Sequence, residues 1–457
     1  MKKKTSHTWK KLMACTMVAG ILMGAMGCGN GIEEWKLSKM KLSNTTENLT
    51  EQYQKEIKDY KEVSVSEEFR QSYADFALNL LNYSSEQTAN ADTNANIDTN
   101  TGAHVNANIN TASNTMVSPL SVMMALELTR NGADGETEEQ MEQTLYGELD
   151  AEEAKQQLMA YLQKLPDRKN AQFHFANSIW LRTGETAFMP KEEFLESSAV
   201  AYGAEIYGAP FTEDTRKDVN KWIEKNTNGM IPEMLPNISP QVIMYLINAV
   251  AFEAEWEQEY EANQIHDAEF TLSDGSVQTV SMMYGEEGTF LKDEDAVGFL
   301  KYYKDGYAFM ALLPEEGMDI HAYKEQLMGA DLLRILEEAE DTSVQTGIPK
   351  FSSETTLELK DALMAMGMED AFDEEKADFS KMGQSSNGNV CINRVLHKTF
   401  VEVDELGTKA GAATVVEMRE TGAAIMESVI LNRPFLYAIV DTESMLPIFI
   451  GIMEQPE

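Results

Sequence analysis

The spacing of apolar residues along the chain predicts that a folded domain begins near residue 66. Ser66 is a residue type that caps helix N-termini, and the apolar side chains after it fall on one face of an α-helix. These side chains are Phe69, Tyr73, Phe76, Ala77 and Leu80. The same spacing predicts further helices over 119–130, 151–165 and 215–225.

Between these helices, runs of apolar and β-branched residues predict strands, several of them long enough for an extended sheet. The runs cover residues 171–181, 242–252, 307–313, 390–403 and 433–440. Helical and strand-like blocks alternate as far as Glu457, so we expect one α+β domain of mixed α/β type over 66–457. The 43% hydrophobic content of the 457-residue chain is sufficient for a large core.

Two segments lack the apolar positions that a core requires. Residues 28–65 are polar and charged, as expected of a tether that holds a domain away from a membrane. Residues 84–113 consist mostly of Ala, Asn, Thr and Asp, which is typical of a disordered, low-complexity surface insertion.

The first 27 residues are typical of an export signal. Five lysines come before an apolar run over 12–27, and this run is shorter than the roughly 20 residues that span a bilayer. The run ends in Ala25-Met26-Gly27-Cys28, which resembles the lipobox of bacterial lipoproteins and implies a lipid on Cys28. We therefore expect an exported protein, lipid-anchored to the outer face of the cell membrane or cell surface. Ordinary secretory cleavage and an uncleaved anchor are the alternatives.

The charge of the chain narrows the class of partner. Seventy-six acidic residues against 37 Lys and Arg give a net charge of −39 at pH 7. The segment 1–27 holds five of the lysines and no acidic residue, so its removal takes the net charge from −39 to −44. Such a chain repels nucleic acids and attracts cationic proteins. The three cysteines are too few and too scattered for a disulfide framework or a zinc site.

The sequence contains none of the common enzyme motifs. The six histidines do not lie in an H-E-x-x-H or other paired metal-ligand spacing. The chain also lacks the G-x-S-x-G elbow, the P-loop and the G-x-G-x-x-G turn of hydrolases, nucleotidases and dinucleotide-binding enzymes. We therefore expect no catalytic activity, no cofactor and no metal.

Short motifs follow one another in a fixed order along the predicted domain. They begin with Asn-Thr-Met-Val-Ser-Pro-Leu-Ser-Val at 114–122 and Gly-Ala-Asp-Gly-Glu-Thr at 132–137. They continue with Leu-Ile-Asn-Ala-Val-Ala-Phe at 246–252, Pro-Lys-Phe at 349–351 and Arg-Pro-Phe at 433–435. This ordered series resembles the serpins, the serine protease inhibitor family, and covers essentially the whole domain.

The resemblance implies a serpin fold with three β-sheets, about nine helices and an exposed reactive-centre loop near the C-terminus. In this family a serine protease attacks the loop and forms an acyl-enzyme. The cleaved loop then inserts as a new strand into the central sheet, which carries the attached protease to the far end and distorts its active site. Each inhibitor molecule therefore acts once, as a suicide substrate.

The residue pattern after Gly407 fits such an insertion. Written as a strand, residues 408–419 have one uncharged face and place every charge on the other face. The uncharged face consists of Thr408, Ala410, Ala412, Thr414, Val416 and Met418. An uncharged face can enter a sheet without burying a charge. Without the resemblance, the frequent alanines make a solvated helix or a flexible loop the alternative.

The resemblance also places the moving parts of the inhibitor. It implies a loop hinge at Glu405, Gly407, Thr408, Lys409, Ala410, Gly411, Ala412, Ala413 and Thr414. The small hinge residues favour an inhibitory member, because non-inhibitory serpins often have proline or charges there. Leu406 and Lys409 depart from the acidic residues that are usual at their positions.

A cluster of polar residues is implied beneath the part of the sheet that opens. The resemblance assigns this shutter to Ser118, Ser121, Asn248 and His397. It places Trp256 at the top of the sheet, in the breach where insertion begins.

The loop length that is usual in serpins, counted from either end of the loop, implies where the cleaved bond lies. Counting forward from Glu405 puts it between Thr421 and Gly422, and counting back from Arg433 puts it after Ala423. Both positions offer a small residue, which fits the shallow specificity pocket of an elastase-like protease.

Larger residues nearby would suit other proteases. A trypsin-like enzyme would prefer Arg419, and a chymotrypsin-like enzyme would prefer Met418 or Met426. We expect a monomeric inhibitor of an extracellular serine protease. The expected protease is cationic and elastase-like. The competing interpretation is a non-inhibitory serpin-fold protein that acts as a surface binding module.

Overall fold

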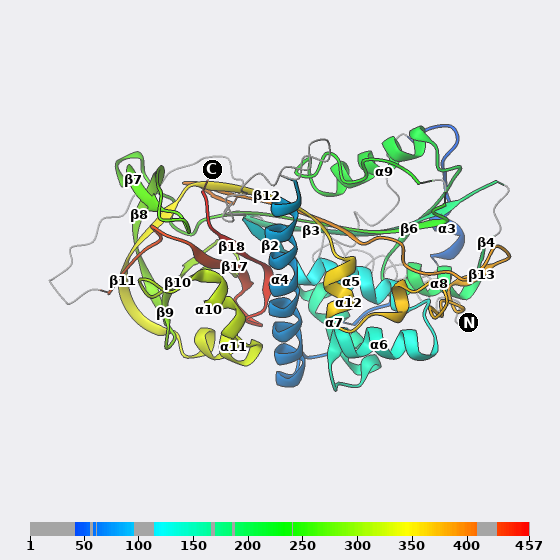
Figure 1. Ribbon diagram of the computed structural model, residues 1–457, viewed down its shortest axis with the longest axis horizontal. Helices are drawn as coiled ribbons and strands as arrows, with labels where there is room; N and C mark the ends of the chain where they lie inside the picture. Colours follow the sequence, from blue (N-terminus) through cyan, green and yellow to red (C-terminus); the bar gives the residue numbers. More distant parts are fainter. Residues whose placement is uncertain are drawn as a thin grey trace, which may run out of the picture. The chain divides into compact units, whose positions relative to one another are not determined.

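The computed structural model describes residues 42–54, 58–60, 62–95, 114–165, 170–184, 188–239, 241–408 and 427–456, the side chains of 86–95 excepted. In these residues the chain forms ten α-helices and three β-sheets (Figure 1). The predicted α+β class with three sheets is confirmed.

The central sheet has seven strands in the order β1-β5-β3-β6-β15-β14-β12. Their bounds are Glu47–Asn48 (β1), Glu205–Ala209 (β5), Ala171–Arg182 (β3), Met244–Glu255 (β6), Gly407–Thr408 (β15), Leu396–Val403 (β14) and Phe351–Glu358 (β12). The antiparallel ladder between β3 and β6 runs over eleven residue pairs. Strand β12 alternates buried and exposed residues, as expected of a strand with one face on the core.

A second sheet has nine strands, eight of them in the order β16-β11-β8-β9-β10-β17-β18-β2, with β7 also paired to β8. Their bounds are Glu427–Ile430 (β16), Glu340–Pro349 (β11), Val277–Lys292 (β8), Ala296–Tyr302 (β9), Tyr307–Pro314 (β10), Phe435–Asp441 (β17), Pro447–Met453 (β18), Thr115–Val117 (β2) and Ile265–Thr271 (β7). Strands β17 and β18 are buried along their whole length, which explains their nearly continuous apolar sequence. Strands β13 (Gly383–Ser385) and β4 (Phe188–Pro190) form the third, small sheet.

The helices pack around these sheets. Their bounds are Thr50–Tyr53 (α3), Glu67–Ala95 (α4), Pro119–Arg130 (α5), Gly135–Tyr146 (α6), Ala151–Lys164 (α7), Glu192–Ala201 (α8), Glu213–Asn226 (α9), Ile320–Gln326 (α10), Gly329–Glu337 (α11) and Lys360–Ala365 (α12). The Ser66 hydroxyl accepts the Phe69 amide at 3.2 Å and so caps α4 as predicted. Helix α9 covers one face of the central sheet and α5 the other (Figure 1). Within the described residues, no helix has the length and apolar character that a membrane span requires.

Most predicted boundaries lie within three residues of the observed ones, and two differ by more. Helix α4 continues to Ala95, inside the segment predicted as an insertion, because its buried N-terminal half anchors a helix that can then be extended one hydrogen bond at a time. Strand β14 begins at Leu396 instead of residue 390. The residues before it bind elsewhere, since the Ile392 amide donates to the Ala371 carbonyl and the Val395 amide to the Glu358 carboxylate.

Part of the segment predicted as a tether contacts the domain. Strand β1 pairs with β5 at the edge of the central sheet, with Glu47 opposite Gly208. The Ser43 amide and the Thr46 hydroxyl donate to the Asp218 carboxylate of α9, at 3.0 and 2.7 Å.

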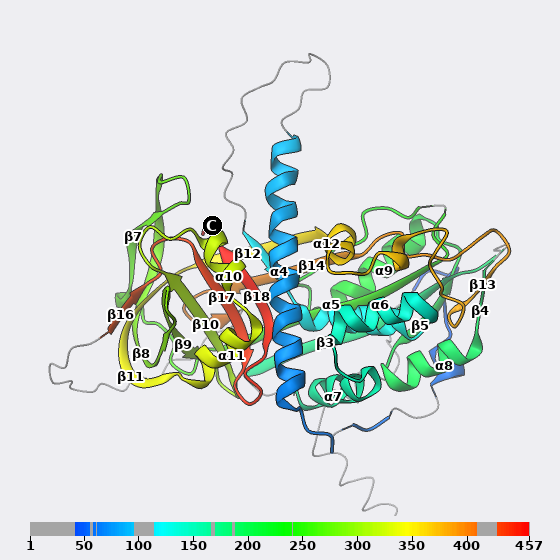
Figure 2. The same ribbon diagram turned by 60° about the horizontal axis from the view of Figure 1, so that its bottom comes forward.

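The segment also places apolar side chains on the core, since Tyr60 is 3% exposed and Leu49 and Tyr53 pack against the core. The prediction that residues 28–65 lack core positions is therefore wrong for this part of the segment. Helices α3 and α8 and strand β5 lie at the end of the domain opposite β16 (Figures 1 and 2).

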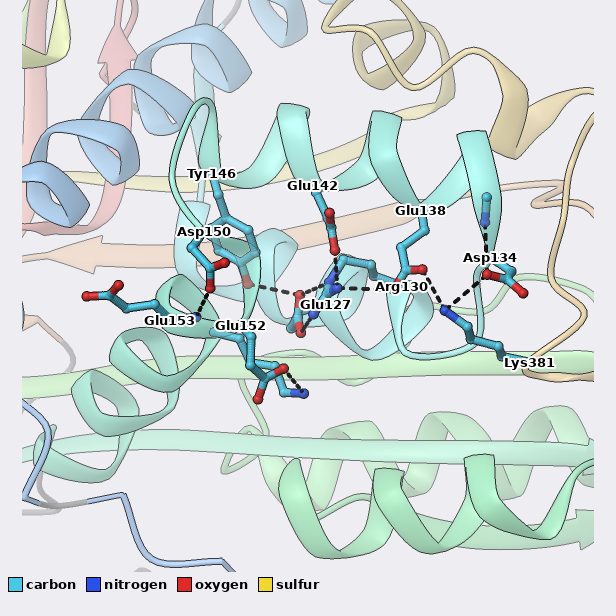
Figure 3. Close-up of polar contacts among 12 residues, drawn as sticks. Glu127, Arg130, Asp134, Glu138, Glu142, Tyr146, Asp150, Glu152, Glu153 and Lys381 are labelled. Atoms are coloured by element: carbon cyan, nitrogen blue, oxygen red, sulfur yellow. Dashed lines mark hydrogen bonds and ion pairs between the residues drawn. The ribbon is translucent and has the colours of Figure 1, made fainter.

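A buried ion pair joins the helices beneath the central sheet. Glu127 of α5 is fully buried and accepts hydrogen bonds from Arg130 at 2.7 and 2.8 Å. The hydroxyls of Tyr146 and Tyr202 also donate to Glu127, each at 2.9 Å. Arg130 reaches Glu142 of α6 at 2.6 Å as well (Figure 3). The pair therefore links α5, α6 and the end of α8.

Candidate loop-insertion site in the central sheet

The two-residue strand β15 lies between β6 and β14 and pairs with both. Gly407 pairs with Glu255 and Thr408 with Ala254 on one side, and Thr408 pairs with Val403 on the other. Strands β6 and β14 also contact each other. In the part of the chain that the structure describes, however, no hydrogen-bonded ladder joins them directly. The segment that leads into the predicted reactive-centre loop therefore lies inside the central sheet, at the boundary between β6 and β14.

A tight turn at residues 404–407 directs the chain into this boundary. The Asp404 carboxylate accepts the amides of Leu406 and Gly407 at 2.8 and 3.1 Å, and the Asp404 amide donates to the Gly407 carbonyl at 3.0 Å. Gly407 has a φ of 150°, and a Cβ there would lie 2.0 Å from the Ala254 carbonyl oxygen. Only glycine fits this position. Burial raises the pKa of Asp404, and the two amide hydrogen bonds oppose this effect.

Groups from neighbouring elements hold the turn in place. The Trp256 indole donates to the Asp404 carbonyl at 2.8 Å, and the Trp256 amide donates to the Leu406 carbonyl at 2.9 Å. The side chain of Lys350 forms an ion pair with Glu405, which lowers the pKa of the Glu405 carboxyl. The structure thus brings Trp256, Glu405, Gly407 and Thr408 together at one end of the β6–β14 boundary.

The four predicted shutter residues form one chain of hydrogen bonds further along this boundary. Ser118 donates its amide to Nε2 of His397 on β14 at 3.0 Å, and its hydroxyl accepts the Ser121 amide at 3.3 Å. The Ser121 hydroxyl donates to the side chain of Asn248 on β6. The first turn of α5 therefore bridges the two strands between which β15 begins. Asn177 of β3 extends the chain, because its side-chain oxygen accepts from Asn248 at 2.9 Å.

Sequence reasoning missed two members of this arrangement. Asn177 is one of five polar residues in β3, so no pattern in the sequence singles it out. Asp404 is followed three residues later by Gly407, which is the sequence signal of an Asx turn.

His397 is buried and neutral. Burial lowers its pKa to about 4, and its Nε2 serves as an acceptor for the Ser118 amide. A protonated ring would place an N–H against that amide and break the hydrogen bond. The geometry makes His397 a link between β14 and α5, and its low pKa keeps this link uncharged at neutral pH.

Acid should destabilise the protein through His397. The pKa of about 4 in the folded state lies below the unfolded value of about 6.5, so the unfolded chain binds more protons between these values. Stability is therefore lost as the pH falls through this range, and lowering the pH to 5 should remove about 2 kcal/mol. Urea unfolding at pH 7 and pH 5 tests this, with His397→Asn expected to show the smaller difference. Equal pH dependence in both proteins would contradict the assignment.

The remaining predicted positions lie outside the described residues. They are the hinge residues Lys409, Ala410, Gly411, Ala412, Ala413 and Thr414, the bond at Thr421 and Gly422, the alternatives at Ala423, Arg419 and Met418, and Cys28. Across the described ranges, no group of three His, Cys, Asp or Glu side chains is arranged to hold a metal ion.

Comparison with known proteins identifies the class. Residues 71–456 match the family model described as Serpin (serine protease inhibitor). The chain is 32% identical to the leukocyte elastase inhibitor of Xenopus laevis over 366 residues, which are 76% of this chain and 94% of that one. The protein belongs to the serpin family, whose members are mostly protease inhibitors and not catalytic enzymes.

Solved structures support the same classification. The native state of the thermophilic serpin tengpin matches with a TM-score of 0.79 and 40% identity, covering 90% of this chain and all of that one. Its latent state matches with a TM-score of 0.72 and 39% identity over 87% of this chain and all of that one. Thyroxine-binding globulin in complex with thyroxine shares the fold, with a TM-score of 0.69 at 20% identity over 85% of this chain and 99% of that one.

Proposed function

We propose that this serpin inhibits an extracellular serine protease as a suicide substrate, by inserting its cleaved reactive loop between β6 and β14. The observation that carries the proposal is β15. Gly407 and Thr408 already pair with β6, and Thr408 also pairs with β14. No ladder among the described residues closes the boundary ahead of them. A loop that is cleaved can extend this strand.

The free energy available from insertion is large. Each inserted residue adds backbone hydrogen bonds worth about 0.5–1.5 kcal/mol, so a dozen residues contribute on the order of 10 kcal/mol. This is comparable to the stability of a whole domain. It is sufficient to drive the displacement of an attached protease.

The chemistry of trapping follows from ordinary acyl transfer. The protease serine oxygen attacks the Thr421 carbonyl, the Thr421–Gly422 amide bond breaks, and the Gly422 amine leaves with the proton from the serine. The ester that remains ties the protease to the new end of the loop. Insertion must then be faster than hydrolysis of this ester.

The partner that fits best is a cationic, elastase-like protease. The small residues at 421–423 fit a shallow specificity pocket, and the leukocyte elastase inhibitor is among the relatives of this chain. A net charge of −44 after removal of the signal segment would speed the approach of a cationic enzyme, more so at low ionic strength. We further propose that the protein is exported and anchored to the cell through a lipid on Cys28. Release of the protein into the medium is the alternative.

Incubation with elastase tests the function. We expect the chain from residue 29 onward to form a detergent-stable covalent complex with neutrophil or pancreatic elastase, faster at low salt. The released peptide should begin at Gly422 if the bond after Thr421 is cleaved, and at Ala424 if the bond after Ala423 is cleaved. Intact mass distinguishes the two peptides. Trypsin, chymotrypsin and subtilisin serve as the comparison. Cleavage by all four enzymes without complex formation, and without a rise in melting temperature after cleavage, would instead favour the non-inhibitory binding protein.

A further inference from the structure

Thr408, the second residue of β15, contacts a side chain that lies next to the second sheet. Its side chain is 1% exposed, and its hydroxyl lies 2.7 Å from the hydroxyl of Tyr303. Tyr303 follows directly after β9 and is joined to Trp256 by an isolated β-bridge. The hinge thus contacts a side chain more than a hundred residues away in sequence, next to a sheet other than the one it enters.

The ring of Tyr303 is held firmly by aromatic neighbours. It stacks on Trp256 with 4.2 Å between ring centroids and an interplanar angle of 11°, and it meets Phe252 edge to face at 5.5 Å. The ammonium of Lys301 lies 5.1 Å from the Trp256 ring and is itself fixed by an ion pair with Glu287 at 2.8 Å. The position of the Tyr303 hydroxyl is therefore determined by packing before Thr408 arrives.

Departure of the hinge would leave this hydroxyl in an unfavourable place. Tyr303 is 2% exposed, and a buried hydroxyl without a hydrogen-bond partner is costly. Within the described residues, the Thr408 hydroxyl is the side-chain hydrogen-bond partner that faces it. Insertion of Thr408 thus satisfies a group that lies next to the second sheet, at the start of the new strand.

We propose that Tyr303 is a positioning residue that latches Thr408 in the central sheet and so sets how often insertion outruns hydrolysis of the acyl-enzyme. The inference rests on the proposed function, because the competition exists only in a serpin that traps its protease. A latched hinge keeps the first residue pair in register, and insertion then only has to extend an existing strand. A released hinge can turn about Gly407 and must find the register again, which gives water time to free the protease.

Removal of a single hydroxyl tests the latch. In Tyr303→Phe the aromatic stack is retained, and the ratio of hydrolysed to trapped inhibitor should rise about fivefold, the effect expected of one buried hydrogen bond. Thr408→Val should do the same, and the double variant should be no worse than either single variant, because both remove one bond. The matched control is Tyr73→Phe in α4. Tyr73 is also buried and loses a 2.9 Å hydrogen bond to the Pro447 carbonyl, but it lies away from the hinge.

A second readout does not depend on inhibition. Amide hydrogen exchange over residues 404–408 should be faster in Tyr303→Phe and unchanged in Tyr73→Phe. If the unchanged protein traps no protease, the proposed function fails, and the exchange measurement still decides whether the latch exists. The proposed latch is wrong if the unchanged protein traps protease and Tyr303→Phe changes neither the ratio of hydrolysed to trapped inhibitor nor the rate of amide exchange. Equal effects of Tyr73→Phe and Tyr303→Phe would also overturn it.

Discussion

If the protein is the inhibitor that we propose, replacement of Thr408 with arginine should convert it into a substrate. Thr408 sits in the central sheet between Ala254 and Val403, with its side chain 1% exposed against Tyr303. A guanidinium group at this position would have to be buried without a partner, at a cost of about 3 kcal/mol or more. The hinge would leave the sheet, and insertion would begin too late to outrun hydrolysis of the acyl-enzyme.

The expected size of this effect follows from that cost. A penalty of about 3 kcal/mol corresponds to a roughly hundredfold change in the partition between trapping and hydrolysis. Gel electrophoresis after incubation with the target protease should show complete cleavage of Thr408→Arg and almost no covalent complex. Thr408→Ser retains the hydroxyl and should behave like the unchanged protein. Undiminished complex formation by the arginine variant would show that residue 408 does not need to enter the sheet.

Replacement of Arg130 with alanine should lower the free energy of unfolding by about 3–5 kcal/mol. Among the described residues, the change leaves the fully buried carboxylate of Glu127 with two tyrosine hydroxyls and without its ion-pair partner. Arg394→Ala removes an arginine whose pair with Glu358 is exposed, with 44% and 41% of the side chains accessible, and should cost less than about 1 kcal/mol. Urea unfolding followed by tryptophan fluorescence gives both values. Similar midpoints for the two variants would mean that burial does not strengthen the Glu127 pair.

The fold was predictable where a local pattern and the final packing agree. The cap at Ser66, the proline at the start of α5 and the apolar runs of β10 and β17 each indicate an element that the structure contains. The ends of strands were less predictable where a hydrogen-bond partner far away in sequence determines them. The amide of Ile392 binds the Ala371 carbonyl, so the residues before β14 leave the strand that their sequence favours. In the N-terminal segment, backbone pairing at β1 likewise has no compositional signal.

The candidate site was predictable to the extent that it lies in contiguous motifs. The motifs at 114–122 and 246–252 contain Ser118, Ser121 and Asn248, and the structure brings these residues together with His397. Tyr303 gave no such signal. In the sequence it is one aromatic residue at the end of an apolar run, and its importance depends on a contact with Thr408 between two sheets. Contacts of this kind follow from the packing of sheets and not from periodicity.

The register of the central sheet also determines where a captured enzyme would end up. Strand β15 pairs with Ala254, near the end of β6, whereas Glu47 of β1 lies in one row with Gly208, Leu181 and Met244, at its beginning. A loop that extends β15 along β6 therefore advances toward the end of the domain at which the N-terminal chain attaches. With the lipid that we propose on Cys28, the captured enzyme would move toward the end of the domain from which the chain leads to the lipid.

The number of residues between Cys28 and the domain then sets the largest distance between the bilayer and the domain. The fourteen residues between Cys28 and Ser43 can span at most about 50 Å. A small domain is about 30 Å across. If Cys28 carries the proposed lipid, a fully extended segment of this length would leave room for an enzyme between the domain and the bilayer, and a much shorter one would press the captured enzyme against the lipid headgroups.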